Sequence, residues 1–348
     1  MKHDLIEESF LLQNLTPDSP PTQNGSNGIM LTRRRMLYAG PGGLLLLALW
    51  SGGIYELARH PSGKASTSNV AAPVPAATDD FAPPPESRIP DGPDGAAIRR
   101  GMALFTEPRA HIPQYVGNDM ACANCHQDAG RKPFAAPMWA AWVAYPKYRS
   151  KNDKINTMEE RIRDCFVYSM NAGASTSGGP PPWGSSVYAD MMAYFRWLAT
   201  DAPVGQDMKG AGFLKLSVPA QGYDRERGRR IYEEQCALCH GSDGNGARGE
   251  QSEILFPPLW GARSYNWGAG MARIDRAAPF ILHNMPKGSE GSLTEQQAWD
   301  VAAWIDSQER PKDPRQTGSI EDAARRYHSK EESFYGKKID EHLLGTGL

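Results

Sequence analysis

The sequence predicts a mainly α-helical protein with two similar helical domains in tandem, preceded by an N-terminal membrane or signal segment. Three observations support this prediction. Apolar residues recur with the helical period in several segments, one cysteine and histidine motif occurs twice, and an apolar stretch follows three arginines near the N-terminus. The 348 residues leave room for two domains of about 100 residues beside that segment.

The composition narrows the class of protein. The net charge is −2, so no bulk electrostatic attraction to nucleic acid is expected. The 35 glycines and 28 prolines indicate domains rich in loops, which suits helices wrapped around a large prosthetic group. Four of the five cysteines fall into the repeated motif, which leaves one odd thiol. A disulfide framework is therefore not expected.

The N-terminal region predicts export from the cytoplasm. Residues 1–35 end in three arginines, and residues 36–58 are mostly apolar. A helix of about 20 residues crosses a bilayer core, and the preceding arginines place the N-terminus in the cytoplasm. Residues 36–58 are either a retained transmembrane anchor or the apolar part of a cleaved signal peptide. In both cases the remainder is expected to be periplasmic, with residues 59–95, rich in Pro, Ala and Ser, as a linker.

The repeated motif predicts two covalently bound hemes of the c type. C-x-x-C-H occurs as Cys122, Cys125 and His126 and again as Cys236, Cys239 and His240. Two thiols on one helical turn can each bond a heme vinyl group, and the histidine that follows becomes the proximal iron ligand. A zinc half-site or a redox dithiol is the alternative, but two motifs in an exported chain with no other cysteine pairs favour heme.

Each motif lies in a similar helical frame, which makes the chain a divergent repeat. Gly101 before the first motif and Gly228 before the second are expected to open helices and to let them cross closely. Aromatic helices over residues 185–200 and 294–309 are expected to close the two units. This frame resembles the class I cytochrome c fold and predicts cytochrome c-like domains at 96–205 and 222–310. Residues 311–348 form a C-terminal extension that is expected to wrap the surface.

The second unit offers a methionine as the sixth ligand of its iron. The sequence around Met285 contains the Met-Pro pair that is typical of class I cytochromes c. His283 and Met271 are the alternative ligands. A His/Met pair raises the reduction potential relative to a His/His pair, which suits the heme from which electrons leave.

The odd thiol, Cys165, lies in a predicted helix over residues 157–173. Thr157 and Glu160 match a capping box. Arg161, Cys165 and Ser169 recur every fourth residue and are expected to share one face. We expect Cys165 to meet the iron of the first heme, and this face to form a substrate site.

The alternative is that Cys165 is a small buried residue and that a methionine binds the first iron. The candidate methionines are Met138, Met158 and Met170. A thiolate ligand would be favoured by the iron charge and by Arg161, and it would make the heme hard to reduce. That choice suits chemistry at the sulfur better than simple electron transfer. Arg161 could instead pair with a heme propionate, and Ser169 could be a surface or locally bonded hydroxyl.

A family resemblance rests on this same helix. The segment from Glu160 to Asn171, together with Tyr145-Pro-Lys-Tyr148 before it, resembles the motif of diheme thiosulfate dehydrogenases. The order of the motif, this helix and a class I domain with Met-Pro also matches that family. The A subunit of the Sox sulfur-oxidising system is the second-ranked resemblance, because it lacks so ordinary a class I second domain.

The resemblance implies a role for each site residue. Cys165 would ligate the first iron and act on the substrate, Arg161 would bind an oxyanion of sulfur, and Ser169 would hydrogen-bond it. A further cation would come from Lys151, where the family tends to have arginine, or from Arg149. Lysine lacks the bidentate fork of arginine.

The implied activity is oxidation of thiosulfate to tetrathionate, in a reaction that the same site allows in reverse. Electrons would leave through the second heme to a periplasmic or membrane acceptor. The alternative is a non-enzymatic diheme electron-transfer cytochrome c, tethered to the membrane as a subunit of a respiratory dehydrogenase. A diheme peroxidase is the third class, and it would require His111 or His283 as an iron ligand.

Overall fold

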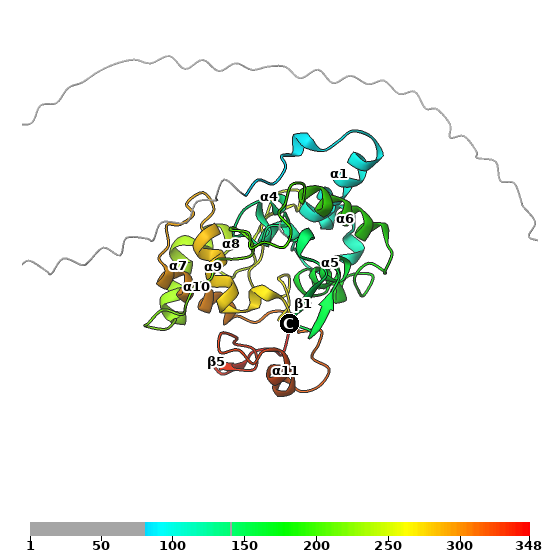
Figure 1. Ribbon diagram of the computed structural model, residues 1–348. Helices are drawn as coiled ribbons and strands as arrows, with labels where there is room; N and C mark the ends of the chain where they lie inside the picture. The colour runs from blue at the N-terminus through cyan, green and yellow to red at the C-terminus, as the bar shows by residue number, and fades with distance from the viewer. Residues whose placement is uncertain (1–80, 140) are drawn as a thin grey trace, which may run out of the picture. The chain divides into compact units, whose positions relative to one another are not determined.

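The computed structural model describes residues 81–139 and 141–348, so the predicted segments 1–35 and 36–58 lie outside the described residues. The described part is mainly helical, as predicted (Figure 1). Its α-helices are α1 (Gly92–Thr106), α2 (Pro108–His111), α3 (Cys122–Cys125), α4 (Gln127–Gly130), α5 (Met158–Asp164), α6 (Ser186–Leu198), α7 (Arg225–Gln235), α8 (Ala237–His240), α9 (Ile274–Asn284), α10 (Glu295–Asp306) and α11 (Ile320–Tyr327).

Shorter elements connect these helices. The strands pair as three antiparallel hairpins: β1 (Lys147–Arg149) with β2 (Lys154–Asn156), β3 (Ala247–Arg248) with β4 (Ile254–Phe256), and β5 (Lys338–Ile339) with β6 (His342–Leu343). Single 3-10 turns are η1 (Glu86–Arg88), η2 (Pro113–Tyr115), η3 (Trp142–Ala144), η5 (Ala172–Ala174) and η6 (Gly270–Ala272). A π-helical turn, η4 (Cys165–Ser169), directly follows α5.

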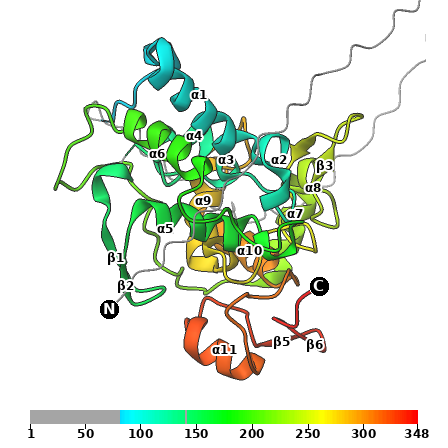
Figure 2. The ribbon, with the colours of Figure 1, turned by 90° about the vertical axis from the view of Figure 1, so that its right-hand side faces the viewer.

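Two pairs of crossing helices frame the two motifs, as the repeat predicted. Helix α1 packs on α6, and α7 packs on α10 (Figures 1 and 2). A Cβ atom on Gly101 would lie 2.0 Å from the carbonyl oxygen of Asp190, and one on Gly228 would lie 1.9 Å from that of Asp300. Only glycine allows backbones to approach so closely. The prediction that these glycines open their helices was wrong: α1 begins at Gly92, where Pro93 suits the first turn, and the glycines mark the crossing points.

An arginine before each glycine strengthens the same crossing. Arg100 donates to both carboxylate oxygens of Asp190 at 2.7 and 2.8 Å. Arg227 does the same to Asp300 at 2.7 and 2.8 Å, and Asp300 is buried. Such bidentate pairs fix the relative orientation of two groups as well as holding them together. The two units therefore share one device for joining their first and last helices.

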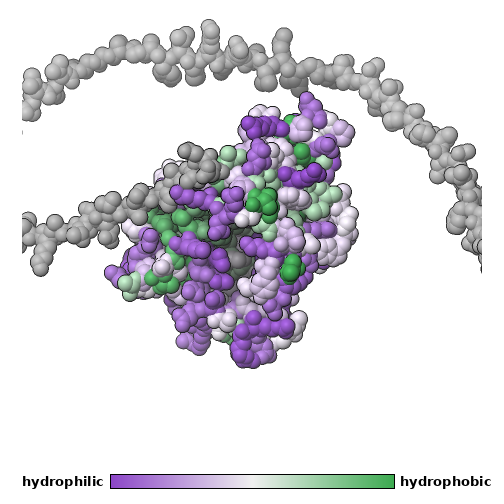
Figure 3. All heavy atoms as spheres, viewed as in Figure 1, coloured by the Kyte–Doolittle hydropathy of each residue, from purple (hydrophilic) through white to green (hydrophobic). Residues whose placement is uncertain are grey.

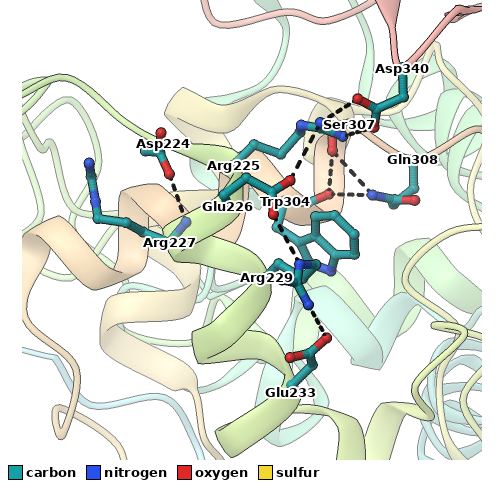
Figure 4. A network of polar contacts seen from close by, with 10 residues as sticks. All are labelled: Asp224, Arg225, Glu226, Arg227, Arg229, Glu233, Trp304, Ser307, Gln308 and Asp340. Atoms are coloured by element: carbon teal, nitrogen blue, oxygen red, sulfur yellow. Dashed lines mark hydrogen bonds and ion pairs between the residues drawn. The ribbon is translucent and has the colours of Figure 1, made fainter.

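The second unit is also tied to the C-terminal segment by polar contacts at the beginning of α7 (Figure 4). Asp224 caps this helix by accepting from the Arg227 backbone N–H at 2.7 Å. Arg229 lies between Glu226 and Glu233, at 3.0 and 2.7 Å. Arg225 donates to Asp340 of the turn between β5 and β6 at 2.7 Å. These contacts are largely exposed, so they add little stability individually, and of those named here the Arg225–Asp340 pair is the one that joins α7 to the C-terminal segment.

The apolar core consists of two clusters. The second cluster is built from α7, α9 and α10, with Tyr232 and Trp299 each 1% exposed. The first cluster is built from α1, α5, η4 and α6, but it also contains Tyr265, Trp267 and Ala269 from the chain between β4 and α9. Residues 261–272 therefore belong to the second unit in sequence, but they complete the apolar core of the first unit.

The C-terminal segment contributes to the core instead of only wrapping the surface as expected. Tyr335 and Leu344 are each 2% exposed and belong to the first cluster, and α11 and the hairpin β5–β6 lie beside one another (Figure 2). Asp313 is fully buried, where it pairs with Arg315 at 2.6 Å and with His328 at 2.8 Å. A segment with high charge can be buried when its ions pair with one another, which hydropathy alone does not reveal.

Within residues 81–139 and 141–348, no helix combines the length and the apolar character that crossing a bilayer requires. The surface of this part is mostly hydrophilic, with apolar side chains in separate patches on the face shown in Figure 3. The predicted membrane contact through residues 36–58 falls outside the described residues.

Candidate functional site

The first motif positions a histidine for metal binding. Helix α3 carries both cysteines, and His126 caps its end. The Nδ1 atom of His126 lies 2.6 Å from the carbonyl oxygen of Ala136. This bond fixes Nδ1 as the protonated nitrogen and leaves Nε2 for a metal, which is the usual arrangement of a metal-binding histidine.

A cavity of about 370 Å³ opens beside His126. One part of its wall is apolar, with Phe105, Met138, Met191 and Phe195. Another part is cationic, with Lys147, Arg149 and Arg161. Cys122, His126 and Cys165 line the same cavity, so the structure brings the odd thiol to the first motif, and its bond to the iron of the first heme stays a prediction.

Cys165 is the most acidic thiol of this site. It lies where α5 passes into η4, and Nη1 of Arg161 donates to its Sγ at 3.0 Å. Burial raises the pKa of a thiol, but the positive Arg161 guanidinium and the His126 ring outweigh burial and lower the pKa of Cys165 to about 7. Burial, followed by the nearby Cys165 sulfur, raises the pKa of Cys125 to about 12. A thiolate is therefore favoured at Cys165 and not at the motif cysteines.

These residues fit a covalently attached heme c. The donor set is an imidazole and a thiolate-prone sulfur that line the same cavity, with the Cys122 thiol on its wall and Cys125 one helical turn further along α3 for the vinyl groups. The apolar wall suits a porphyrin face, and the cationic wall suits carboxylates or an anion. His126 and Cys165 would hold the iron, and Cys122 and Cys125 would hold the porphyrin.

Ser169 lies on a different side of Cys165 from Arg161. A second, small cavity of about 30 Å³ is lined by Ser169 and by Cys165, but not by Arg161. The predicted helix over 157–173 starts with the expected capping box at Thr157 and reaches Asn171 in the left-handed conformation. Its last turn is π-helical, however, and the extra residue in that turn rotates Ser169 away from the face that Arg161 and Cys165 share.

The two candidate cations on the hairpin β1–β2 differ in their surroundings. Arg149 lines the cavity and pairs with Asp164 at 2.5 Å. Lys151 does not line it: its Nζ donates to the Gly268 carbonyl at 2.6 Å and lies 3.6 Å from the centre of the Tyr168 ring. Burial, followed by the nearby cations, lowers the pKa of Lys151 to about 7. Arg149 is thus the better placed of the two for an anion in this cavity.

Lys147 is a cavity cation that the sequence reasoning missed. It lies two residues before Arg149 on β1, and residues i and i+2 of a strand point to the same face. A strand predicted over residues 147–149 would have grouped the two side chains, but a strand of three residues gives too short a pattern to detect.

The second motif is arranged like the first. Nδ1 of His240 lies 2.9 Å from the carbonyl oxygen of Pro257 and leaves Nε2 for iron. Met285 follows α9 directly and packs against the second cluster, as do Cys236 and Leu259. Within the described residues Nε1 of Trp304 is buried there without a hydrogen-bond partner, and a heme carboxylate is a group that can accept from it.

The alternative ligands face other parts of the molecule. His283 packs on Phe134 of the first unit, with ring centroids 4.7 Å apart. Met271 packs against both clusters and lines the small cavity beside Cys165. His111 lies on the short helix α2, about half exposed, near Glu107. These placements favour Met285 over the other candidates. They give no support to His111 or His283 as the iron ligand that a diheme peroxidase would require.

We predict that Met285→Leu removes the sixth ligand of the second iron. The absorbance that arises from a methionine–iron bond should disappear, and the reduction potential of that heme should fall by on the order of 0.1 V, because methionine ligation raises it. Redox titration followed by absorbance measures both effects. Met271→Leu is the matched control and should leave both unchanged; the opposite pattern would make Met271 the ligand.

The described chain matches two cytochrome families in sequence. Residues 101–204 match the family described as "SoxA/TsdA, cytochrome c domain", and residues 224–305 match "Cytochrome C oxidase, cbb3-type, subunit III". The chain is 43% identical over 305 residues to a thiosulfate dehydrogenase of Stutzerimonas stutzeri. That alignment covers 87% of this chain and 97% of the relative. It is 45% identical over 265 residues to a thiosulfate dehydrogenase of Thiomonas intermedia, covering 76% and 82%.

A solved structure is similar as well. The "as isolated" form of a thiosulfate dehydrogenase (TsdBA) from Marichromatium purpuratum aligns with a TM-score of 0.74 at 49% identity. The alignment covers 77% of this chain and 58% of that chain. This chain therefore spans somewhat more than half the length of that protein.

Proposed function

Because the chain belongs to the diheme thiosulfate dehydrogenase family, we propose that it oxidises thiosulfate to tetrathionate at the first heme site and passes the electrons out through the second heme. The observation that carries the proposal is the contact between Arg161 and Cys165, 3.0 Å apart, on the wall of the cavity that His126 lines. A pure electron carrier has no need of a guanidinium paired with a reactive sulfur.

The residues of the cavity have separate roles. Arg161, with Arg149 and Lys147, binds the sulfonate oxygens of the dianionic substrate by charge-assisted hydrogen bonds. Cys165 supplies the reacting sulfur and is held as a thiolate by Arg161. Ser169 and Lys151 do not line this cavity, so we do not place them in contact with the substrate. We assign the role of the second substrate cation to Arg149.

The proposed chemistry balances without a proton. The Cys165 thiolate and the outer sulfur of thiosulfate form an S–S bond, with the loss of two electrons. The thiolate-like sulfur of a second thiosulfate then attacks the sulfane sulfur of this adduct, which forms tetrathionate and releases Cys165 as a thiolate. In sum, two thiosulfates give one tetrathionate and two electrons. These electrons would go to the two hemes, which supply one-electron redox chemistry when bound.

The proposal is tested by mixing the diheme holoprotein with thiosulfate and an artificial electron acceptor. One tetrathionate should appear for every two thiosulfates consumed and every two electrons delivered. Tetrathionate and a reduced donor should give the reverse reaction at the same site. A holoprotein with two attached hemes that does neither would leave the alternative of an electron-transfer cytochrome.

We predict that Arg149 matters more than Lys151 for substrate affinity. Arg149→Gln should raise the KM for thiosulfate about tenfold or more, because a hydrogen bond to a charged group contributes about 1.5–3 kcal/mol. Lys151→Gln should change KM less than about threefold, since the lysine already binds Gly268 and Tyr168. Steady-state kinetics of the two variants decides the matter, and a larger effect at Lys151 would reverse the assignment.

We also propose the arrangement of the remaining chain. Heme domains at 96–205 and 222–310 lie in the periplasm, with residues 311–348 as an extension and 36–58 as a tether or signal. Export is supported by the arginines before an apolar stretch and by the two heme-attachment motifs. Membrane fractionation and the N-terminal sequence of the mature protein test the tether: a protein that starts beyond residue 58 has no anchor there.

A further inference from the structure

The turn that carries Cys165 has four backbone carbonyls whose partners all come from outside the turn. The last four C=O groups of a helix have no partner within it. Here the carbonyls belong to Val167, Tyr168, Ser169 and Met170, and each accepts a hydrogen bond from a segment distant in sequence. The C=O groups at a helix end more often accept hydrogen bonds from water or from the residues that follow. A complete set of donors from distant segments is therefore unusual.

Asn266 supplies two of these bonds from the loop of the second unit. Its Nδ2 donates to the carbonyl of Val167 at 2.9 Å and to Oδ1 of Asn171 at 3.0 Å. Its backbone N–H donates to the carbonyl of Tyr168 at 3.2 Å. Its Oδ1 accepts from the Gly268 N–H at 3.0 Å, and the side chain is fully buried. Its carbonyl accepts from the Ala269 N–H at 2.9 Å, so every polar group of this asparagine is used, and two of its hydrogen bonds hold η4.

Asn118 supplies the third bond from the segment that leads into the first motif. Its Nδ2 donates to the carbonyl of Ser169 at 2.8 Å and to that of Ser264 at 2.9 Å. Its Oδ1 accepts from the Met120 N–H at 3.1 Å, and the residue is 2% exposed. The neighbouring Gly117 N–H donates to the carbonyl of Met170 at 2.9 Å.

At two glycines the backbone approaches its neighbours too closely for any residue that has a Cβ atom. A Cβ atom on Gly117 would lie 2.1 Å from the carbonyl oxygen of Asn171, and one on Gly268 would lie 2.4 Å from the Tyr168 ring. The two donor segments are also joined to each other, because the Asp119 N–H donates to the Arg263 carbonyl at 3.0 Å. The backbones of the two donor segments therefore lie in close contact with the end of η4 and are hydrogen-bonded to one another.

We propose that Asn266 and Asn118 are positioning residues for Cys165. They fix the π-helical turn in the conformation that presents the sulfur to Arg161 and His126, and Asn266 makes that conformation depend on the second unit. π-Helical turns cost hydrogen bonds of the ordinary α pattern and occur often at functional sites. Two buried asparagines whose side-chain amides are fully hydrogen-bonded offset that loss here. The inference rests on the proposed function, because it takes Cys165 as the iron ligand and the reacting sulfur.

The test uses the diheme holoprotein and its Asn266→Ala variant. Low-spin EPR of the ferric protein reports the ligands of each heme independently of turnover. We expect the signal of the thiolate-ligated heme to shift or to be replaced in part by a second species, while the signal of the His/Met heme stays the same. The kcat for thiosulfate should fall about 10–100-fold with KM within about threefold, since a small displacement of a reacting atom has that effect.

Ser264→Ala is the matched control. Ser264 lies in the same loop, is fully buried, and its hydroxyl bonds the Pro258 carbonyl rather than η4. This variant should keep the wild-type EPR spectrum and kcat. Asn118→Ala is the second test variant, which reaches the same turn from the first unit and should reproduce the effect of Asn266→Ala.

The outcomes separate the two proposals. A wild-type protein with neither a thiolate signal nor turnover contradicts the proposed function. A wild type with both, and Asn266→Ala and Asn118→Ala variants that keep its spectrum and kcat, overturns the positioning role alone. Failure of both variants to attach two hemes, while Ser264→Ala attaches them, would also overturn it and assign the asparagines to folding instead.

Discussion

Replacing Cys165 by glycine should abolish thiosulfate oxidation while both hemes stay attached. Heme attachment depends on the two C-x-x-C-H motifs, which the substitution leaves intact. Turnover should fall by about 10³-fold or more, because removal of a reacting nucleophile leaves only substrate binding to assist the reaction. The EPR signal of the His/thiolate heme should disappear as well, since Cys165 lies on the cavity wall beside His126.

Met170→Leu provides the control for this experiment. Met170 is 1% exposed, lines the small cavity beside Cys165, and is one of the methionines that could bind the first iron if the thiol were idle. A change from methionine to leucine conserves volume, so the fold should tolerate it. If Met170→Leu destroys the heme 1 signal and Cys165→Gly does not, a methionine is the ligand and the sulfur chemistry must be assigned elsewhere.

Replacing Arg161 by alanine is the second substitution with a large expected effect. The kcat/KM for thiosulfate should fall about 10²–10³-fold, because one preorganised charged donor at a reacting centre has an effect of that size. The loss has two sources: the substrate oxygens lose a cation, and the Cys165 thiolate loses the guanidinium at 3.0 Å. Arg161→Lys should retain part of the activity, because lysine keeps the charge but not the fork.

Arg163 offers a matched control on the same helix. Its guanidinium donates to the Pro181 carbonyl at 3.0 Å and stacks on the Trp183 ring at 4.7 Å, outside the cavity. Arg163→Ala therefore removes the same kind of side chain from α5 without removing a cavity cation. Kinetics within about threefold of wild type are expected for it. Equal losses in the Arg161 and Arg163 variants would show that α5 needs its positive charge for stability, not for catalysis.

At three positions the local sequence pattern was incomplete, and the fold adds what it lacked. Gly101 marks a helix crossing rather than a helix start, because its partner Asp190 is far away in the sequence. Ser169 leaves the shared face because η4 is π-helical, and the spacing of side chains cannot distinguish one extra residue per turn. Lys151 points to Tyr168 because Gly268 brings the loop of the second unit against it.

Short stretches of sequence are enough to predict the features that depend on a few neighbouring residues. These features are the two heme-attachment motifs, the capping box at Thr157, the Met285-Pro286 pair and the odd thiol on a helix with Arg161 one turn before it. Their spacing follows from covalent chemistry and from the hydrogen bonds of one helical turn. The family resemblance could be stated from the same short segments.

How these segments contact one another depends on the folded chain. It placed Cys165 beside His126, turned Arg149 toward the cavity and Lys151 away from it, and closed η4 with Asn118 and Asn266. Each of these contacts joins residues from separate segments. Which contacts form depends on which hydrogen-bond donors and acceptors are buried together in the packed core. No local pattern encodes that pairing, because burial and the requirement to satisfy every buried polar group arise only once the chain has folded.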